Sequence, residues 1–239
     1  MFVRGELSGS TNFRAAIEKS KVLVYKTHMH EEMTGILRFP FSAAAACVPS
    51  AVFLDRDGTI NTQVCGECVT GWAGFRFMPG AIAALSALAP LPDRIIVISN
   101  QQSIGKGLMS VDELKDLTVR FVEEARREGA RIDDVYYCPH LLEQGCACRK
   151  PRPGLLQRAA ADWGLDLGCC CMIGDSLSDV LAAEAAGCAA ILIDQESAGD
   201  RDAAARRWPL ARDLGEAVQL ILKARAAPGR LAASAAAAE

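Results

Sequence analysis

Short apolar runs that alternate with helical segments constrain this chain's fold most strongly. The runs are residues 51–54, 94–98, 134–137, 169–173 and 189–193. A helical segment follows each run, at residues 80–89, 110–128, 154–163, 176–186 and 214–224. Strands buried on both faces are continuously apolar, and they belong to parallel sheets covered by helices. The pattern therefore predicts a three-layer, Rossmann-like α/β fold, with any site at the carboxyl ends of the strands.

Three regions differ in composition. Residues 51–225 carry the alternation and are predicted to form one domain. Residues 1–50 have no clear helical or strand period, so we expect an extension of unknown role. A targeting role for it stays an alternative, although its glutamates are unlike an acid-poor transit peptide. Residues 226–239 are rich in alanine and are expected to be a tail.

Composition excludes several classes of protein. The 239 residues are 51% apolar with a net charge of -3, which gives no general attraction to nucleic acid or an anionic membrane. No apolar run approaches the roughly 18 residues of a membrane helix. Of the 10 cysteines, residues 169–171 are adjacent within an apolar run, and Cys138, Cys146 and Cys148 cluster with a histidine, a pattern typical of a reducing compartment with a metal site. We expect a cytoplasmic monomer whose partner is a small molecule.

Two carboxylates directly follow the first apolar run, in the sequence Asp55-Arg-Asp57-Gly-Thr59. Carboxylates this close repel each other and are costly to bury unless they share a cation. Mg²⁺ takes carboxylate oxygens, and an aspartate can attack phosphorus to give an acyl phosphate. A surface turn is the alternative, because Asp-Gly is a common turn dipeptide.

Three more polar motifs follow in order. Ser99 and Asn100 end the second run, Lys150 lies in Cys-Arg-Lys-Pro, and Gly-Asp175-Ser-Leu-Ser-Asp179 follows the fourth run. Alone, each has an ordinary explanation: a helix cap, a solvated lysine or a turn residue. Together, over residues 51–195, they resemble the four motifs of the haloacid dehalogenase (HAD) superfamily.

The resemblance implies a magnesium-dependent phosphatase. Asp55 would be the nucleophile and Asp57 the general acid and base, with Mg²⁺ held by Asp55, the Asp57 backbone carbonyl and Asp175. Asp179 would orient Lys150 or a metal-bound water. The predicted phosphate- and substrate-binding residues are Ser99, Asn100, Gln101, Gln102, Arg149 and Lys150.

A third cluster has the donors of a zinc site. Three cysteines and a histidine fall within eleven residues: Cys138, His140, Cys146 and Cys148. Cys-x-His followed by Cys-x-Cys can surround one tetrahedral Zn²⁺, and short loops suit a structural site. The alternative is a coincidence in a cysteine-rich chain.

The other cysteines receive different predictions. Cys65 and Cys68 have the spacing of a metal knuckle without a second pair, so we expect a substrate loop, with a metal or redox role as the alternative. Residues 169–171 and Cys188 are expected to be small buried apolar residues.

The zinc loop narrows the resemblance to heptose-bisphosphate phosphatases and the histidinol-phosphatase domain, which have almost no cap. The implied substrate is the 7-phosphate of D-glycero-D-manno-heptose 1,7-bisphosphate, with Arg149 and Lys106 holding a second phosphate. Histidinol phosphate is one alternative, because Glu67 could bind its amine. A nucleic-acid 3′-phosphatase is the other, and the low pI of about 5.7 argues against it.

Overall fold

The computed structural model describes residues 37–40, 51–63, 68–90, 94–194 and 207–226, with side chains described in all but 37–40 and 224–226. All of these residues belong to one compact unit, Ile36–Glu239. The predicted boundaries of the extension and the tail stay predictions.

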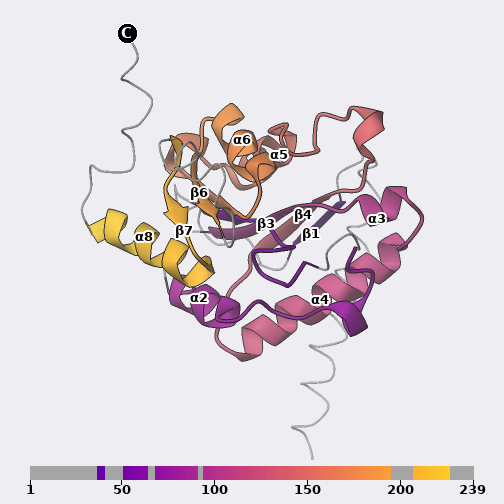
Figure 1. Ribbon diagram of the computed structural model, residues 1–239, viewed down its shortest axis with the longest axis horizontal. Coiled ribbons are helices and arrows are strands. Elements are labelled where there is room, and N and C mark those ends of the chain that lie inside the picture. The colour runs from indigo at the N-terminus through magenta and orange to yellow at the C-terminus, as the bar shows by residue number, and fades with distance from the viewer. Residues whose placement is uncertain (1–36, 41–50, 64–67, 91–93, 195–206, 227–239) are drawn as a thin grey trace, which may run out of the picture. The chain divides into compact units, whose positions relative to one another are not determined.

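A seven-stranded sheet, in the order β1-β4-β3-β2-β5-β6-β7, forms the middle layer of this unit (Figure 1). Six strands are parallel, and β1 pairs antiparallel with β4 at one edge. The strands are β1 (Leu37–Pro40), β2 (Ala51–Leu54), β3 (Arg94–Asn100), β4 (Asp134–Cys138), β5 (Cys171–Gly174), β6 (Ala189–Ile193) and β7 (Leu210–Ala211).

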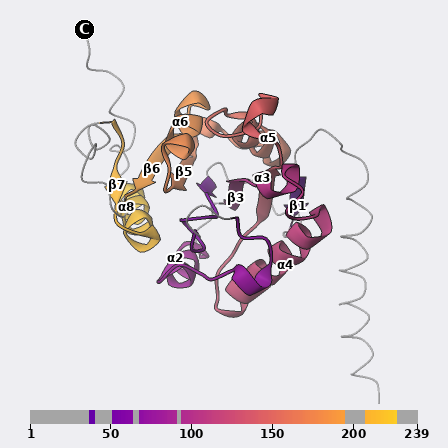
Figure 2. The same cartoon turned by 45° about the vertical axis from the view of Figure 1, so that its right-hand side comes forward.

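Helices cover both faces of the sheet, which confirms the predicted three-layer α/β fold (Figures 1 and 2). One face carries α2 (Ala81–Leu88), α4 (Val111–Arg127) and α8 (Leu214–Ala226). The other carries α5 (Gly154–Trp163) and α6 (Leu177–Ala185). The short α3 (Gln102–Gly105) follows β3, and 3-10 turns occupy η1 (Trp72–Gly74), η2 (Leu142–Gln144) and η3 (Leu167–Cys169).

Local signals set the helix boundaries. Ser110 caps α4 by accepting a hydrogen bond from the Glu113 backbone N–H, and the Glu113 carboxylate accepts one from the Ser110 N–H in return. This is the predicted capping box. Gly164 ends α5 in the left-handed conformation, which costs glycine little.

Four details differ from the sequence expectations. Leu37–Pro40 form a strand within a segment that showed no strand period, and β7 was not predicted. The fourth strand begins two residues later than expected, at Cys171. Cys169 is exposed rather than buried, because it ends η3 and its thiol lies 3.6 Å from Asp166 Oδ2. Cys170, Cys171 and Cys188 are buried as predicted.

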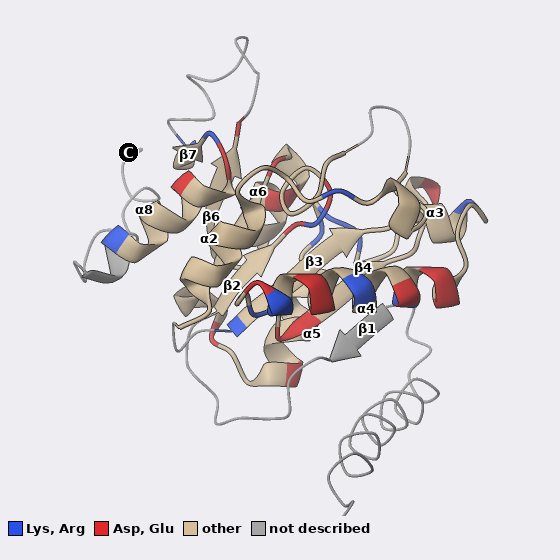
Figure 3. Ribbon diagram, turned by 90° about the horizontal axis from the view of Figure 1, so that it is seen from below, with Lys and Arg blue, Asp and Glu red and all other residues tan. Residues whose placement is uncertain are grey.

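The connections leave the end of the sheet open. Residues 55–80 link β2 to α2, and residues 139–153 link β4 to α5. Both are shorter than a typical domain, which agrees with the predicted minimal cap. Figure 3 shows lysine and arginine mixed with aspartate and glutamate along the α4 ribbon. Within the described residues, no helix has the length and apolar character needed to span a bilayer.

Candidate active site

Lys150 joins three strands at the carboxyl end of the sheet. Its ammonium donates to Asp55 Oδ1 at 2.7 Å and to the Ile98 carbonyl at 2.8 Å, and it lies 2.5 Å from Asp179 Oδ1. Asp55 directly follows β2, Ile98 lies in β3, and Asp179 lies in the first turn of α6, which follows β5. Burial alone would lower the pKa of Lys150, but the Asp179 and Asp55 carboxylates raise it above its usual value. The lysine therefore stays cationic.

Three carboxylates surround that ammonium. Asp55, Asp175 and Asp179 each offer an oxygen, all within 4.8 Å of one another. Burial raises the pKa of Asp55 to about 8, and burial followed by the Asp179 charge raises that of Asp175 to about 6. All three carboxylates in their ionised form would leave an excess of negative charge beside the single ammonium, and the raised pKa values of Asp55 and Asp175 reflect burial together with this repulsion. Mg²⁺ prefers oxygen ligands, so this cluster fits it, and a bound Mg²⁺ would offset the repulsion among the carboxylates.

Gly58 lets the loop approach this cluster. Its φ is +86°, and a Cβ added there would lie 1.9 Å from Asp175 Oδ2. Any side chain would therefore displace the Asp175 carboxylate. The glycine of the aspartate motif brings the loop after β2 against the loop after β5.

Asp57 is held by donors on several sides. Arg56 Nη2 donates to both of its oxygens at 2.8 and 2.9 Å, Asn61 Nδ2 donates to Oδ1 at 2.9 Å, and Gln101 Nε2 donates to Oδ2 at 2.6 Å. Burial would raise the pKa of Asp57, but the Arg56 charge and these hydrogen bonds together hold it below its usual value. Asp57 is therefore an ionised carboxylate here, ready to accept a proton.

Asn100 and Gln101 line the pocket and also form hydrogen bonds with other protein groups. Gln101 Nε2 bridges Asp57 to Ser99 Oγ, at 3.1 Å from the hydroxyl. The Asn100 amide pairs with the Lys150 backbone, accepting from its N–H and donating to its carbonyl, both at 3.1 Å. Asn100 thus fixes the chain that carries the lysine.

Nine of the predicted residues line a single pocket of about 230 Å³. They are Asp55, Asp57, Ser99, Asn100, Gln101, Gln102, Arg149, Lys150 and Asp175. Asp179 lies behind Lys150, and Cys68, Ser176 and Ser178 complete part of the wall. Lys106 is exposed beyond α3 and is not among the lining residues. Cys65 and Glu67 lie outside the described residues.

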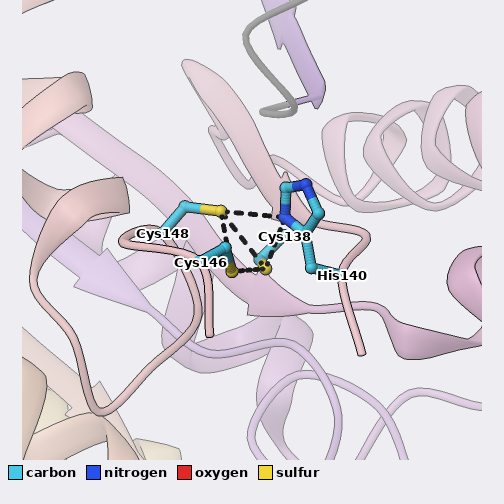
Figure 4. Close-up of side chains that lie close together, drawn as sticks. All are labelled: Cys138, His140, Cys146 and Cys148. Carbon is cyan, nitrogen blue, oxygen red and sulfur yellow. Dashed lines mark hydrogen bonds between the residues drawn. The ribbon is translucent and has the colours of Figure 1, made fainter. Parts of the chain in front are cut away.

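The Cys/His loop brings its four side chains together (Figure 4). The sulfurs of Cys138, Cys146 and Cys148 lie 3.4–3.6 Å apart, and His140 Nδ1 lies 3.2 Å from Cys148 and 3.5 Å from Cys138. A tetrahedral Zn²⁺ with bonds of about 2.0–2.3 Å places its ligands roughly 3.5–3.8 Å apart. These separations and donors are compatible with zinc.

The same loop supplies two pocket residues, because Arg149 and Lys150 directly follow Cys148. Arg149 Nη1 donates to the His140 carbonyl at 3.2 Å, and its Nη2 lies 3.5 Å from Gln102 Oε1. The Cys/His cluster and the pocket are thus neighbours along the chain and in space.

Comparisons with known proteins agree with this geometry. A HAD-hydrolase-like family model matches residues 147–217. D-glycero-alpha-D-manno-heptose-1,7-bisphosphate 7-phosphatase of Mycobacterium tuberculosis is 40% identical over 161 residues, covering 62% of this chain and 81% of the relative. The corresponding beta-heptose enzyme of Rhodopseudomonas palustris is 40% identical over 144 residues, with coverages of 57% and 79%. The chain belongs to the heptose-bisphosphate phosphatase family of HAD-like hydrolases.

Solved structures extend the likeness to the fold of this family. The D,D-heptose 1,7-bisphosphate phosphatase of B. bronchiseptica, complexed with magnesium and phosphate, aligns with a TM-score of 0.67 and 28% identity. The alignment covers 74% of this chain and 99% of that one. A HAD-like phosphatase of Mesorhizobium loti aligns with the same TM-score at 27% identity, covering 82% and 97%. The predicted HAD resemblance and phosphatase class are confirmed.

Sequence reasoning missed one residue of this heptose-bisphosphate phosphatase family site. Arg56 is fully buried and pairs with Asp57, but it received no role from the sequence. A signal was present, because an arginine between two aspartates directly after a buried strand carries a charge that requires a partner if it enters the protein.

Proposed function

We propose that this protein is a phosphomonoesterase that removes the 7-phosphate of D-glycero-D-manno-heptose 1,7-bisphosphate. One observation carries the chemistry: a buried aspartate at the end of the central strand contacts a buried lysine, beside a second aspartate in one open pocket. The names of the relatives carry the substrate.

In the first step Asp55 attacks phosphorus, and the bond from phosphorus to the sugar oxygen breaks. The bonding electrons go to that oxygen, which takes a proton from Asp57. Lys150 and Ser99 bind the phosphoryl oxygens, where negative charge must be stabilised during transfer. Asp57 must be protonated for this step, and the approach of a phosphate dianion raises a neighbouring carboxyl pKa in the required direction.

In the second step water attacks the phosphorus of the Asp55 acyl phosphate. Asp57, now a carboxylate, accepts a proton from that water. The bond between phosphorus and Asp55 then breaks, which releases inorganic phosphate and restores the nucleophile. The hydrogen bonds that hold Asp57 ionised suit this half of the cycle.

Both metals belong to the proposal. Asp55, Asp175 and the Asp57 backbone carbonyl would hold Mg²⁺, which supplies charge neutralisation of the carboxylates and the phosphate. Asp179, already paired with Lys150, would orient the lysine. Cys138, His140, Cys146 and Cys148 would hold a structural Zn²⁺ that fixes the loop carrying Arg149 and Lys150.

Selectivity for a bisphosphate would come from Arg149. It reaches the pocket from the Cys/His loop and can bind a second phosphate with its planar fork. Histidinol phosphate carries an amine, which would instead favour a carboxylate at this position.

The test compares kcat/KM for the alpha and beta anomers of heptose 1,7-bisphosphate and for histidinol phosphate. We expect a bisphosphate to be the best substrate, and Arg149→Ala to lower its kcat/KM while leaving p-nitrophenyl phosphate nearly unchanged. Arg127→Ala is the matched control, because that arginine is exposed on α4 and pairs with Glu124. The sugar assignment is wrong if histidinol phosphate is better by about tenfold, roughly 1.4 kcal/mol of transition-state preference.

A further inference from the structure

Arg56 lies between the two aspartates but does not face the pocket with them. Its side chain is 0% exposed, and the pocket lining includes Asp55 and Asp57 but not Arg56. An arginine does not give up its proton, so a fully buried guanidinium must be paired. Its partner here is Asp57, the proposed general acid and base.

The pairing involves both carboxylate oxygens. Arg56 Nη2 contacts Oδ1 at 2.8 Å and Oδ2 at 2.9 Å, and Nε contacts Oδ1 at 3.2 Å. A planar fork on a planar carboxylate restrains rotation of that group, which a single donor would not do. The Arg56 backbone carbonyl also accepts from the Ile60 and Asn61 N–H groups at 2.8 and 3.0 Å, which brings Asn61 to Asp57.

The far side of the guanidinium is held as well. Its carbon lies 5.7 Å from the centroid of the Tyr137 ring on β4. The Tyr137 hydroxyl is hydrogen-bonded to Thr118 Oγ1 on α4 at 3.0 Å, and both residues are buried. A buried chain of contacts therefore runs from α4 through Tyr137 and Arg56 to Asp57.

We infer that Arg56 is a positioning residue that fixes the Asp57 carboxylate in the orientation needed to protonate the leaving oxygen. This inference rests on the proposed function and deepens it. Small errors in the placement of a general acid cost rate, because proton transfer needs the donor within hydrogen-bond reach of its acceptor. Arg56 acts without touching the substrate.

The leaving group provides the test. The alkoxide that leaves an alkyl phosphate needs a proton as it departs, whereas the p-nitrophenolate that leaves p-nitrophenyl phosphate does not. Losing the Arg56 fork should therefore lower kcat/KM for an alkyl phosphate more than for p-nitrophenyl phosphate. A purely structural role would lower both equally.

The experiment measures kcat/KM for p-nitrophenyl phosphate and for the alkyl phosphate that the wild type hydrolyses fastest. For Arg56→Lys, which keeps the charge and loses the fork, we expect a loss at least about tenfold larger on the alkyl ester. Arg94→Lys is the matched control, because Arg94 is also buried, lies 3.7 Å from Asp133 and stacks on Trp163. It should change both substrates by the same factor.

A second variant covers failure of Arg56→Lys to fold. Tyr137→Leu keeps an apolar side chain but removes the ring under the guanidinium, and we expect the same preference at about threefold. Equal losses on the two esters in every folded variant would overturn the inference alone. A wild type that releases phosphate from neither ester would overturn the proposed function and the inference with it.

Discussion

The carboxylate pocket and the Cys/His loop are two sets of metal-compatible donors, linked by Arg149 and Lys150, and they are built in opposite ways. The pocket gathers hard oxygen donors from the ends of two strands, β2 and β5, and lies in a cavity open to solvent. The loop gathers soft donors from a stretch of eleven residues, and its four donor atoms contact one another. Open positions suit chemistry and closed ones suit structure. The comparison assigns reaction to the first set and support to the second.

Replacing the nucleophile has the largest expected effect. Asp55→Asn should lower kcat by about 10⁴-fold or more, because an amide cannot form the acyl phosphate. Phosphate release from p-nitrophenyl phosphate with Mg²⁺ measures it. The fold should survive, since asparagine keeps the size of the side chain and an oxygen that can accept from Lys150, and the Lys150 ammonium stays paired with Asp179. Steady turnover by the pure variant would show that the pocket works by another route.

The second-largest expected effect is that of a chelator, which should remove the metal from the carboxylate pocket but not from the Cys/His loop. We expect EDTA to lower activity by about 100-fold or more, and added Mg²⁺ to restore it, while zinc stays bound. The closed thiolate cluster should hold its metal more tightly than the open oxygen cluster. Metal analysis before and after dialysis provides the measurement. Loss of zinc together with magnesium would contradict the distinction between the sites.

Removing one ligand from the Cys/His loop should affect stability more directly than activity. Cys146→Ser should lower the free energy of unfolding by about 4 kcal/mol or more, because structural zinc contributes folding free energy. A melting temperature lower by about 10 °C would match that loss. Activity should fall with it, since Lys150 lies just beyond the loop. An unchanged melting temperature, or wild-type protein prepared without chelators that lacks zinc, would remove the supporting role.

The smallest expected effect lies away from both regions. Ser110→Ala removes the cap of α4 and should cost about 1 kcal/mol of stability. kcat and zinc content should stay at their wild-type values. Denaturant unfolding and a single assay measure this. A change in kcat would mean that loss of the cap shifts α4 enough to disturb Asp57 through Thr118, Tyr137 and Arg56.

Much of the fold was predictable because its strands are continuous apolar runs, separated by helical segments with clear start and stop signals. The two missed strands show the limits of that signal. β7 has only two residues, and β1 is a short edge strand that ends in proline and depends on pairing with β4. Edge strands bury less, so their sequences carry a weaker pattern.

Within the site, the order of the motifs predicted which residues meet but not how they contact one another. Asn100 and Gln101 were expected to bind substrate, and each also holds a protein group, the Lys150 backbone and Asp57 respectively. Such contacts depend on side-chain directions in three dimensions, which spacing along the chain does not encode. The same limit applies to Arg56. Its partner Asp57 is the next residue in the chain, but its positioning role follows from the burial of its side chain, which the sequence alone does not reveal.

The ammonium of Lys150 also ties activity to the order in which the chain is made. It bonds Asp55 across 95 residues of sequence and meets the Ile98 carbonyl and Asp179 at the same point. At about 5–20 residues per second, a ribosome delivers the nucleophile several seconds before its lysine. A nascent chain therefore carries Asp55 without its cationic partner. Hydrolysis can begin only after β3 and β5 have both paired with β2, which brings Lys150 and Asp179 to Asp55. Recovered turnover on refolding should accordingly trail the recovery of helical signal.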